Sequence, residues 1–314
     1  MLNRALMQVN AVAIGGHVRP DGDCVGSTLG LYQYIKKCFP NIQVDLYLED
    51  IPESFKPMFP VSEEILHEVD MEKEYDLFIA LDCGDAGRLG FSAPLFEKAK
   101  ATMCIDHHVS NASFADENYI IPDASSTSEL VYNLLDKEKI TTEIAECLYL
   151  GIVHDTGVFQ YSCTSPTTME IAADLMRKGI RSNEIIDKTF YEKTYAQNQI
   201  LGRALLESFL FMDGKCIVSY ITKKIMDFHG VTPKDLEGIV SQLRVTKGVE
   251  VAILLYETAP QEYKVSLRAT GDVDVSKVAG FFGGGGHKKA AGVTMKGTVH
   301  DIINNLAEQI DLQL

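Results

Sequence analysis

The sequence predicts an α/β protein, with a parallel-sheet N-terminal domain that carries helices on both faces and a smaller α+β domain after it. In the first half of the 314-residue chain, short apolar runs alternate with helical patterns, as in parallel sheets built from crossover units. Polar clusters directly follow several of these runs, where α/β sheets bind ligands. After a turn signal at Asp213-Gly214, the order becomes strand, helix, helix, strand, strand and helix.

The expected strands of the first domain are apolar runs at 11–14, 44–48, 75–81, 102–105 and 119–121. A helical pattern at 27–38 follows the first strand. From residue 125 the periodicity is helical, and Ser126 or Ser128 can cap one helix and Thr141 or Thr142 the next. Further helices fit 166–178 and 183–191.

The second domain is expected to follow a helical connector, because a helical pattern without proline runs over 195–209. We predict domain limits of 1–190, 191–212 for the connector, and 213–314. The expected elements of the last domain are strands at 216–221, 250–256 and 263–269, with helices near 275–282 and 300–310. Segment 283–286 consists of four glycines, which argues against regular structure there.

Composition and charge limit the function classes. Apolar residues make up 46% of the chain and its net charge is −15, so we expect a globular protein without the basic surface that coats long duplex nucleic acid. No apolar run approaches the roughly 20 residues of a membrane span, and the first residues do not resemble a signal peptide. The seven cysteines form no C-x-x-C pair, which favours reduced thiols and a cytoplasmic protein.

A first polar cluster, His17, Asp21 and Asp23, follows the first expected strand on a loop that Pro20 and Gly22 make tight. Carboxylate oxygens combined with an imidazole suit Mn²⁺, Fe²⁺ or Zn²⁺ better than Ca²⁺. A solvated Asp-Gly turn would give the same pattern. Taken alone, the cluster does not decide between these alternatives.

Asp82 ends the apolar run 77–81, with Asp85 and Arg88 close behind it. An acid at the carboxyl end of a strand faces the ligand crevice of an α/β sheet, so Asp82 is the better ligand candidate. Asp85 could orient the loop or pair with Arg88.

The triplet Asp106-His107-His108 lies at another strand end, and Asp155 stands where a helix is expected to close. Two adjacent imidazoles beside an acid are rarely needed for packing, so the triplet favours a functional site. By itself, Asp155 would also fit a helix-end turn.

These clusters together predict a site for two divalent cations roughly 3.5–4 Å apart, with one carboxylate shared between them. The six candidate ligands are His17, Asp21, Asp23, Asp82, His107 and Asp155. Asp82 is the expected bridge. Together with Asp106 and His108 it forms the candidate catalytic group, in which His108 is free to donate to a phosphate or a leaving oxygen.

The glycine run is a candidate phosphate-binding element, because glycine lets backbone N–H groups approach an anion. We expect Gly284, Gly285 and Gly286 to act in this way, with a following helix adding its positive end. His287 and the two lysines after it add charge, and Arg268 on the preceding strand can aim its guanidinium at the same point.

These motifs resemble the DHH family of phosphoesterases, which is named for a triplet like Asp106-His107-His108. The segment from His17 to Ser27 looks like the first family motif and Asp82 corresponds to the second. The triplet itself is the third motif, and Asp155 corresponds to the fourth. The glycine run with Ala290-Ala291-Gly292 looks like the signature of the associated C-terminal domain.

Within the family, the chain is similar to the nanoRNases, or oligoribonuclease/pAp phosphatases. The resemblance implies a Mn²⁺-dependent enzyme, with Mg²⁺ or Co²⁺ as alternatives, that trims very short RNA and removes one phosphate from pAp (adenosine 3′,5′-bisphosphate). It implies substrate-phosphate roles for Arg268 and His287, and also for Arg88 and His108. A phosphodiesterase for linear or cyclic dinucleotides, a pyrophosphatase or exopolyphosphatase, and a silent binding module are the alternatives. The sequence does not decide whether the protein forms a homodimer.

Overall fold

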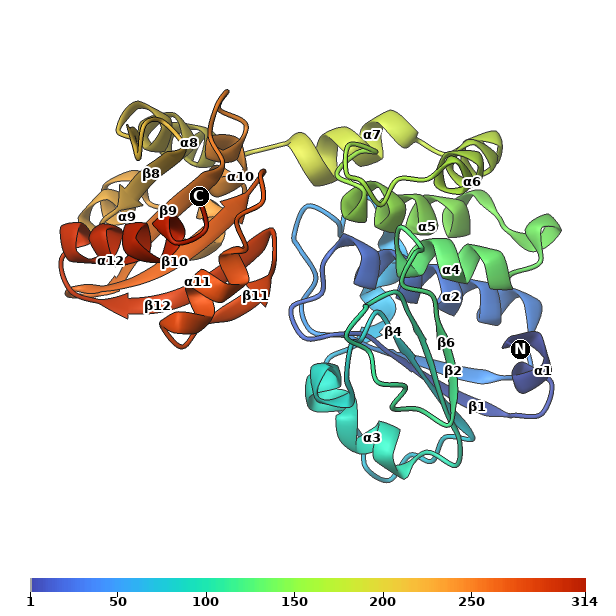
Figure 1. Ribbon diagram of the computed structural model, residues 1–314. Coiled ribbons are helices and arrows are strands. Elements are labelled where there is room, and N and C mark those ends of the chain that lie inside the picture. The colour runs from blue at the N-terminus through green and yellow to red at the C-terminus, as the bar shows by residue number, and fades with distance from the viewer. Residues whose placement is uncertain (1) are drawn as a thin grey trace. The chain divides into compact units, whose positions relative to one another are not determined.

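The computed structural model describes residues 2–314, and their contacts divide the chain into two compact units, one ending at Glu192 and one spanning Lys193–Leu314 (Figure 1). Each unit has a sheet of its own. The expected α/β class is confirmed, with a parallel sheet in the first unit and a second sheet in the C-terminal unit. Within residues 2–314, no helix is long and apolar enough to span a bilayer.

The first unit contains a six-stranded sheet in the order β3-β2-β1-β4-β5-β6, and every neighbouring pair is parallel. Its strands are β1 (Ala11–Gly15), β2 (Gln43–Tyr47), β3 (Ile65–Leu66), β4 (Leu77–Leu81), β5 (Thr102–Asp106) and β6 (Glu117–Ile120). Every residue of β4 is buried, as expected for a central parallel strand covered on both faces. The short β3 has no counterpart among the predicted strands.

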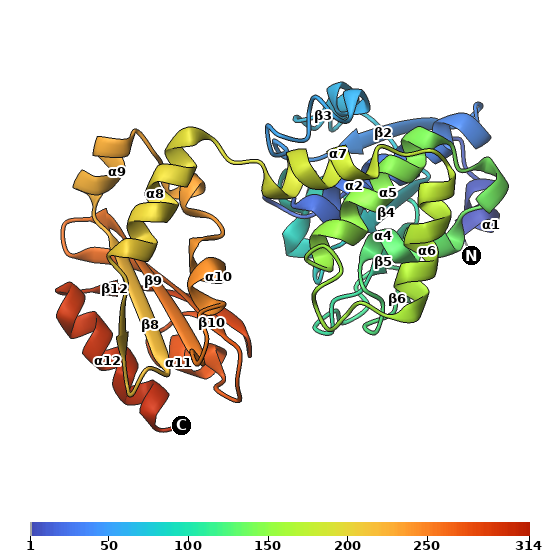
Figure 2. The ribbon, with the colours of Figure 1, turned by 90° about the horizontal axis from the view of Figure 1, so that it is seen from above.

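Helices cover both faces of this sheet (Figures 1 and 2). On one face, α2 (Gly22–Cys38), α4 (Thr127–Leu134) and α5 (Thr142–Asp155) pack on apolar side chains such as Ile14 and Leu81. On the other face, the 3₁₀ helix η2 (Ala86–Ser92) and α3 (Ala93–Lys98) cover Phe78 and Ala80. The remaining elements are α1 (Leu2–Leu6), η1 (Pro60–Glu64), η3 (Lys137–Lys139), α6 (Pro166–Arg177), α7 (Ser182–Ile186) and the π-helical turn η4 (Asp187–Tyr191).

The helix after β1 begins earlier than predicted, and this changes where one candidate ligand lies. The Asp21 side chain accepts hydrogen bonds from the backbone N–H groups of Asp23 and Cys24, at 3.1 and 3.2 Å, and so caps α2. Asp23 therefore lies in the first turn of a helix. The prediction of a loop over this segment was wrong, because the capping capacity of Asp21 was overlooked.

The second unit contains a mixed sheet in the order β11-β12-β10-β9-β8-β7, in which only the β8–β9 pair is parallel among the described strands. Its elements are α8 (Tyr195–Leu206), β7 (Phe209–Phe211), β8 (Cys216–Ile221), α9 (Lys223–His229), η5 (Pro233–Leu236), α10 (Ile239–Arg244), β9 (Val251–Ala259), β10 (Glu262–Ala269), α11 (Val275–Phe281), β11 (Gly285–His287), β12 (Ala290–Lys296) and α12 (Val299–Asp311). One core lies under α8, α9 and α10, and the other under α11 and α12.

Two expectations for this part of the chain need correction. The helical pattern at 195–209 ends as a helix at Leu206, and Ile200 and Ala204 of α8 are buried in a core of the second unit. Gly285 and Gly286 of the glycine run lie in β11, which pairs antiparallel with β12, whereas Gly283 and Gly284 lie outside regular structure as expected. The element after the glycines and β11 is the strand β12, and the helix end that adjoins the glycines is the C-terminus of α11, so the expected positive helix end is not there. The domain limits given above stay a prediction.

Candidate active site

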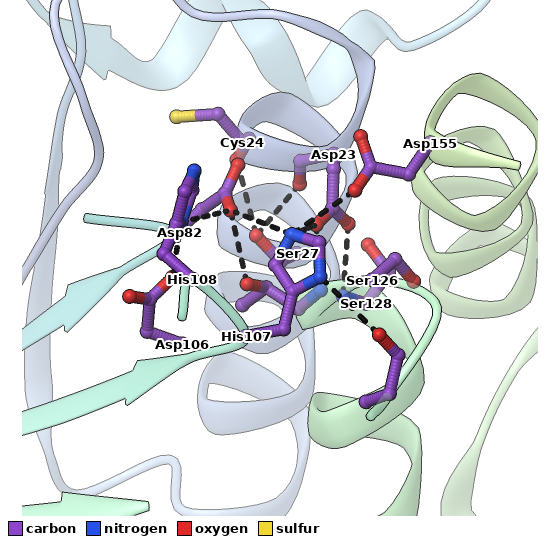
Figure 3. A network of polar contacts seen from close by, with 12 residues as sticks. Asp23, Cys24, Ser27, Asp82, Asp106, His107, His108, Ser126, Ser128 and Asp155 are labelled. Carbon is purple, nitrogen blue, oxygen red and sulfur yellow. Dashed lines mark hydrogen bonds and ion pairs between the residues drawn. The ribbon is translucent and has the colours of Figure 1, made fainter. Parts of the chain in front are cut away.

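The carboxyl edge of the first sheet gathers side chains from five segments (Figure 3). His17 follows β1, Asp82 follows β4, and Asp106 ends β5 with His107 and His108 after it. Two helices bring further acids, because Asp23 lies in the first turn of α2 and Asp155 is the last residue of α5. Parallel strands end at one edge, which explains why clusters distant in sequence meet here.

Asp82 lies between two groups of these side chains and faces each group with one oxygen. Its Oδ2 is 3.4 Å from Nε2 of His17, which is also 3.5 Å from Oδ1 of Asp21. Its Oδ1 is 3.7 Å from Nε2 of His107. The residue is 2% exposed, and its backbone has φ +58°, a left-handed conformation that costs an L-residue about 1–2 kcal/mol. Strained backbone of this kind often marks a functional position.

The second group surrounds His107. Its Nε2 is 3.0 Å from Oδ2 of Asp155 and 4.0 Å from Oδ2 of Asp23. Figure 3 shows these acids and Asp82 pointing toward the His107 ring. The six predicted ligands thus lie in two groups that share Asp82. Donor atoms of Asp23, His107 and Asp155 lie within 4.8 Å of one another, as do those of His17, Cys24 and Asp82, so either set could hold a metal ion. Cys24 was not anticipated.

The electrostatics of this cluster reflect crowded carboxylates. Burial alone would lower the pKa of His17, but Asp21 and Asp82 outweigh it and raise the pKa to about 10. Burial likewise opposes a charged His107, yet Asp155 and the other acids raise its pKa to about 10. Burial and the Asp82 carboxylate raise the pKa of Asp23. The metal-free cluster therefore retains protons that a cation would displace on binding.

His108 is held by Asp106 and also lies beside the shared acid, because its Nδ1 is 3.7 Å from Oδ1 of Asp82, and donor atoms of Asp82, His107 and His108 form a third set that could hold a metal ion. Its Nδ1 lies 2.7 Å from Oδ1 of the fully buried Asp106, and this hydrogen bond is the main reason that the pKa of His108 is raised. The amide of Asn111 donates to the other Asp106 oxygen at 2.7 Å and to the Cys83 carbonyl at 2.9 Å. Asn111 was missed by the sequence reasoning, because nothing in its spacing signals this contact.

The N-terminal turn of α4 was also missed as part of the site. The backbone N–H groups of Thr127 and Ser128 donate to Oδ2 and Oδ1 of Asp23, at 2.6 and 2.9 Å. The Thr127 hydroxyl donates to Oδ1 of Asp82 at 3.0 Å. The sequence indicated only that this segment caps a helix, which it does through Ser126.

His154 is a packing residue in α5, one position before Asp155. Its ring packs edge-on against Phe55 and Phe190, and Nε2 lies 3.0 Å from the Thr189 hydroxyl. A Cβ at Gly22 would lie 2.2 Å from Cγ of this ring. Gly22 is therefore needed for the close approach of α2 to α5, which brings Asp23 and Asp155 together.

Arg88 lies half-buried in η2, and its carbonyl accepts a hydrogen bond from the Val18 N–H at 2.8 Å. This bond ties η2 to the loop after His17. The alternative pairing of Asp85 with Arg88 is not found, since Arg88 forms no ion pair with any residue in the part of the chain that the structure describes.

The candidate phosphate-binding residues of the second unit lie in one row across its sheet. His287 on β11 and Arg268 on β10 both pair with Ala290 on the strand between them, so their side chains leave the same face. A Cβ at Gly284 or Gly286 would lie 2.4 Å from a β12 carbonyl oxygen. These two glycines are thus needed for packing on β12, whereas a Cβ at Gly285 would meet open space.

Comparison with known proteins identifies the class to which this fold and this carboxylate–imidazole cluster belong. Residues 11–152 match the DHH family, N-terminal domain, and residues 213–312 match the DHHA1 domain. The chain therefore combines a DHH family N-terminal domain with a DHHA1 domain.

Particular relatives narrow the comparison. The chain is 29% identical to the bifunctional oligoribonuclease and PAP phosphatase NrnA of Thermus thermophilus, over 91% of this chain and 84% of that protein. It is 28% identical to the protein of the same name from Bacillus subtilis, over 94% of this chain and 92% of that protein. The crystal structure of an exopolyphosphatase-related protein from Bacteroides fragilis superposes with a TM-score of 0.91 and 27% identity, over 99% of this chain and 94% of that one.

Proposed function

We propose that this chain is a Mn²⁺-dependent phosphoesterase that hydrolyses short oligoribonucleotides to mononucleotides and converts pAp to AMP. The observation that carries the proposal is the pair of ligand groups on either side of Asp82. Relatives that align with more than nine tenths of the chain are named for these two activities. We also propose a cytoplasmic setting, in which the seven free cysteines stay reduced.

The proposed metal ligands form two mixed donor sets. His17, Asp21 and Asp82 make one set, and His107, Asp23, Asp155 and Asp82 make the other. Imidazole together with carboxylate suits Mn²⁺, with Mg²⁺ and Co²⁺ as alternatives. Two divalent cations held there would neutralise phosphoryl oxygens and supply an activated water. Asp82 reaches both sets, one oxygen to each, which is the arrangement that a bridging carboxylate requires.

His108 is proposed as the group that donates a proton to the leaving oxygen. Its Nδ1 faces Asp106 at 2.7 Å, which fixes the ring and leaves Nε2 as the atom able to reach a substrate. The hydrogen bond to Asp106 raises the pKa of His108, which favours the protonated ring that a general acid needs. In this assignment Asp106 orients the acid, and Asn111 in turn orients Asp106.

Substrate phosphates are proposed to contact Arg268 and His287 in the second unit and Arg88 in the first. A guanidinium and an imidazole leaving one face of the sheet give charge-assisted donors suited to a phosphate. Because Gly285 has open space beside it, its backbone can be approached closely. We propose Gly284, Gly285 and Gly286 as backbone contacts for the same anion, without help from a helix terminus.

The test is a substrate panel on metal-stripped protein, with Mn²⁺, Mg²⁺ and Co²⁺ returned separately. The panel contains pAp, labelled RNA of two to five nucleotides, linear and cyclic dinucleotides, and pyrophosphate. We expect turnover of pAp and of the short RNAs, highest with Mn²⁺. Turnover of pyrophosphate alone would overturn the nucleotide assignment. Metal binding without any turnover would favour a silent binding module.

A further inference from the structure

The first turn of α4 contacts two of the proposed ligands at the same time. Thr127 donates its backbone N–H to Asp23 and its hydroxyl to Asp82, at 2.6 and 3.0 Å. The Ser128 N–H donates to the remaining Asp23 oxygen at 2.9 Å. Thr127, Ser128 and Asp23 are all fully buried, so no solvent competes for these bonds. One turn of one helix therefore fixes an acid from α2 and an acid from the tip of β4.

These donors are available because the first residues of a helix have no intrahelical acceptor. The Ser126 hydroxyl accepts from the Glu129 N–H at 3.0 Å and completes the cap. The N–H groups of Thr127 and Ser128 remain, and Asp23 takes one with each oxygen. A carboxylate bound through both oxygens cannot rotate, yet each oxygen keeps a lone pair for a further partner.

The Thr127 hydroxyl is used differently from the buried hydroxyls of Thr28 and Thr156, and resembles that of Thr168, which donates to the Glu129 carboxylate at 2.7 Å. Thr28 in α2 and Thr156 at the C-cap of α5 bond back to the carbonyl four residues earlier, at 2.6 Å each, as helical threonines commonly do. Thr127 is the first residue of α4, and its hydroxyl contacts Asp82 across the site. The contacted oxygen is Oδ1, the one that faces His107 at 3.7 Å.

We propose that Thr127 is a positioning residue that sets the rotation of the Asp82 carboxylate. In this orientation Oδ1 faces the group around His107 and Oδ2 faces the group around His17. This inference rests on the proposed two-cation site. The hydroxyl takes one lone pair of Oδ1 and holds the plane of the carboxylate, and the backbone N–H of the same residue holds Asp23. Partners of this kind, one step removed from a metal, tune the affinity of the ligands that they orient.

The substitution that isolates the hydroxyl is Thr127→Val, which keeps the β-branched shape and the backbone N–H to Asp23. Thr127→Ser keeps the hydroxyl and should restore the contact. Thr28→Val is a matched control, since it removes an equally buried hydroxyl that bonds only to backbone carbonyls of α2. Mn²⁺ binding to metal-free protein is measured by calorimetric titration and by electron paramagnetic resonance, which separates coupled from isolated Mn²⁺.

We expect T127V to bind one of two Mn²⁺ ions about 10–100-fold more weakly and to lose the coupled signal. T127S and T28V should match the wild type. If metal-free T127V fails to give a cooperative melt, T127A is compared with T127S in its place.

The outcomes separate the two proposals. Wild-type protein without two Mn²⁺ sites would overturn the proposed function itself. Two sites in the wild type and unchanged affinities in T127V would overturn only the role of Thr127. Equal losses in T127V and T127S would assign the effect to side-chain shape and would likewise overturn it.

Discussion

Asp82→Asn is the most direct test of a shared ligand, because asparagine preserves the size of the side chain. Asparagine also tolerates left-handed backbone, so the φ of +58° at this position remains accessible. The change removes the negative charge and replaces one oxygen by an amide nitrogen, which cannot ligate a cation. One of the two groups around Asp82 loses its shared ligand, and both lose the charge.

The size of the effect follows from linkage. A ligand present at 100 times its Kd stabilises the folded state by about 2.7 kcal/mol per site. For a unit of 192 residues, each kcal/mol raises Tm by about 2–4 °C. Mn²⁺ should therefore raise the Tm of the wild type by about 5–10 °C for each occupied site, and that of D82N by far less. Turnover should fall by at least about 10²–10³-fold, the scale for losing one preorganised electrostatic group.

The assay combines thermal melts with and without Mn²⁺ and initial rates with pAp. Asp85→Asn is the matched control, because Asp85 is an exposed acid three residues away with no capping bond. D85N should keep the full metal-dependent rise in Tm. A D82N protein with wild-type rates and an undiminished rise in Tm would refute Asp82 as the shared ligand.

Three further predictions address charge and binding. Because acids raise the pKa of His17 and His107 to about 10 each, both imidazoles carry protons near pH 8. Mn²⁺ affinity should therefore increase with pH, and binding should release protons, as measured by calorimetry in buffers of different ionisation enthalpy. His287→Ala should raise KM for pAp while the bound Mn²⁺ count stays at two; a loss of metal would place His287 among the ligands. Burial opposes a charged Glu146, but hydrogen bonds from Arg181 outweigh burial and lower its pKa. In urea unfolding, the Glu146→Ala variant should have a free energy of unfolding about 1–3 kcal/mol below that of the wild type at pH 7. This difference should shrink as the pH falls through the lowered pKa of Glu146.

The sequence was sufficient to predict the parallel sheet and the cluster at its edge, because both follow from local patterns. Apolar runs mark the strands, and an acid or imidazole directly after a run must lie at the carboxyl edge. Asp82 and His107 could be located in this way without knowing the strand order. The three segments that follow β1, β4 and β5 then converge because parallel strands share one edge, whereas Asp23 and Asp155 reach the site on helices α2 and α5.

Contacts between distant segments could not be predicted in the same way. Asp23 and Thr127 are 104 residues apart, and nothing local to either shows that a helix N-terminus meets a carboxylate. The glycine run misled the prediction for a related reason. Gly284 and Gly286 are required by the backbone of β12, a partner whose approach a single-segment reading does not reveal.

The β11–β12 hairpin has a two-residue connection between His287 and Ala290, and its length matters more than its composition. Side chains alternate between the faces of a sheet, so a slip of one residue in β11 would turn His287 to the opposite face from Arg268. Exchanging either lysine of the connection leaves the alternation intact, whereas inserting or deleting one residue does not. We therefore expect the number of residues in this connection to be constrained more strictly than their identity.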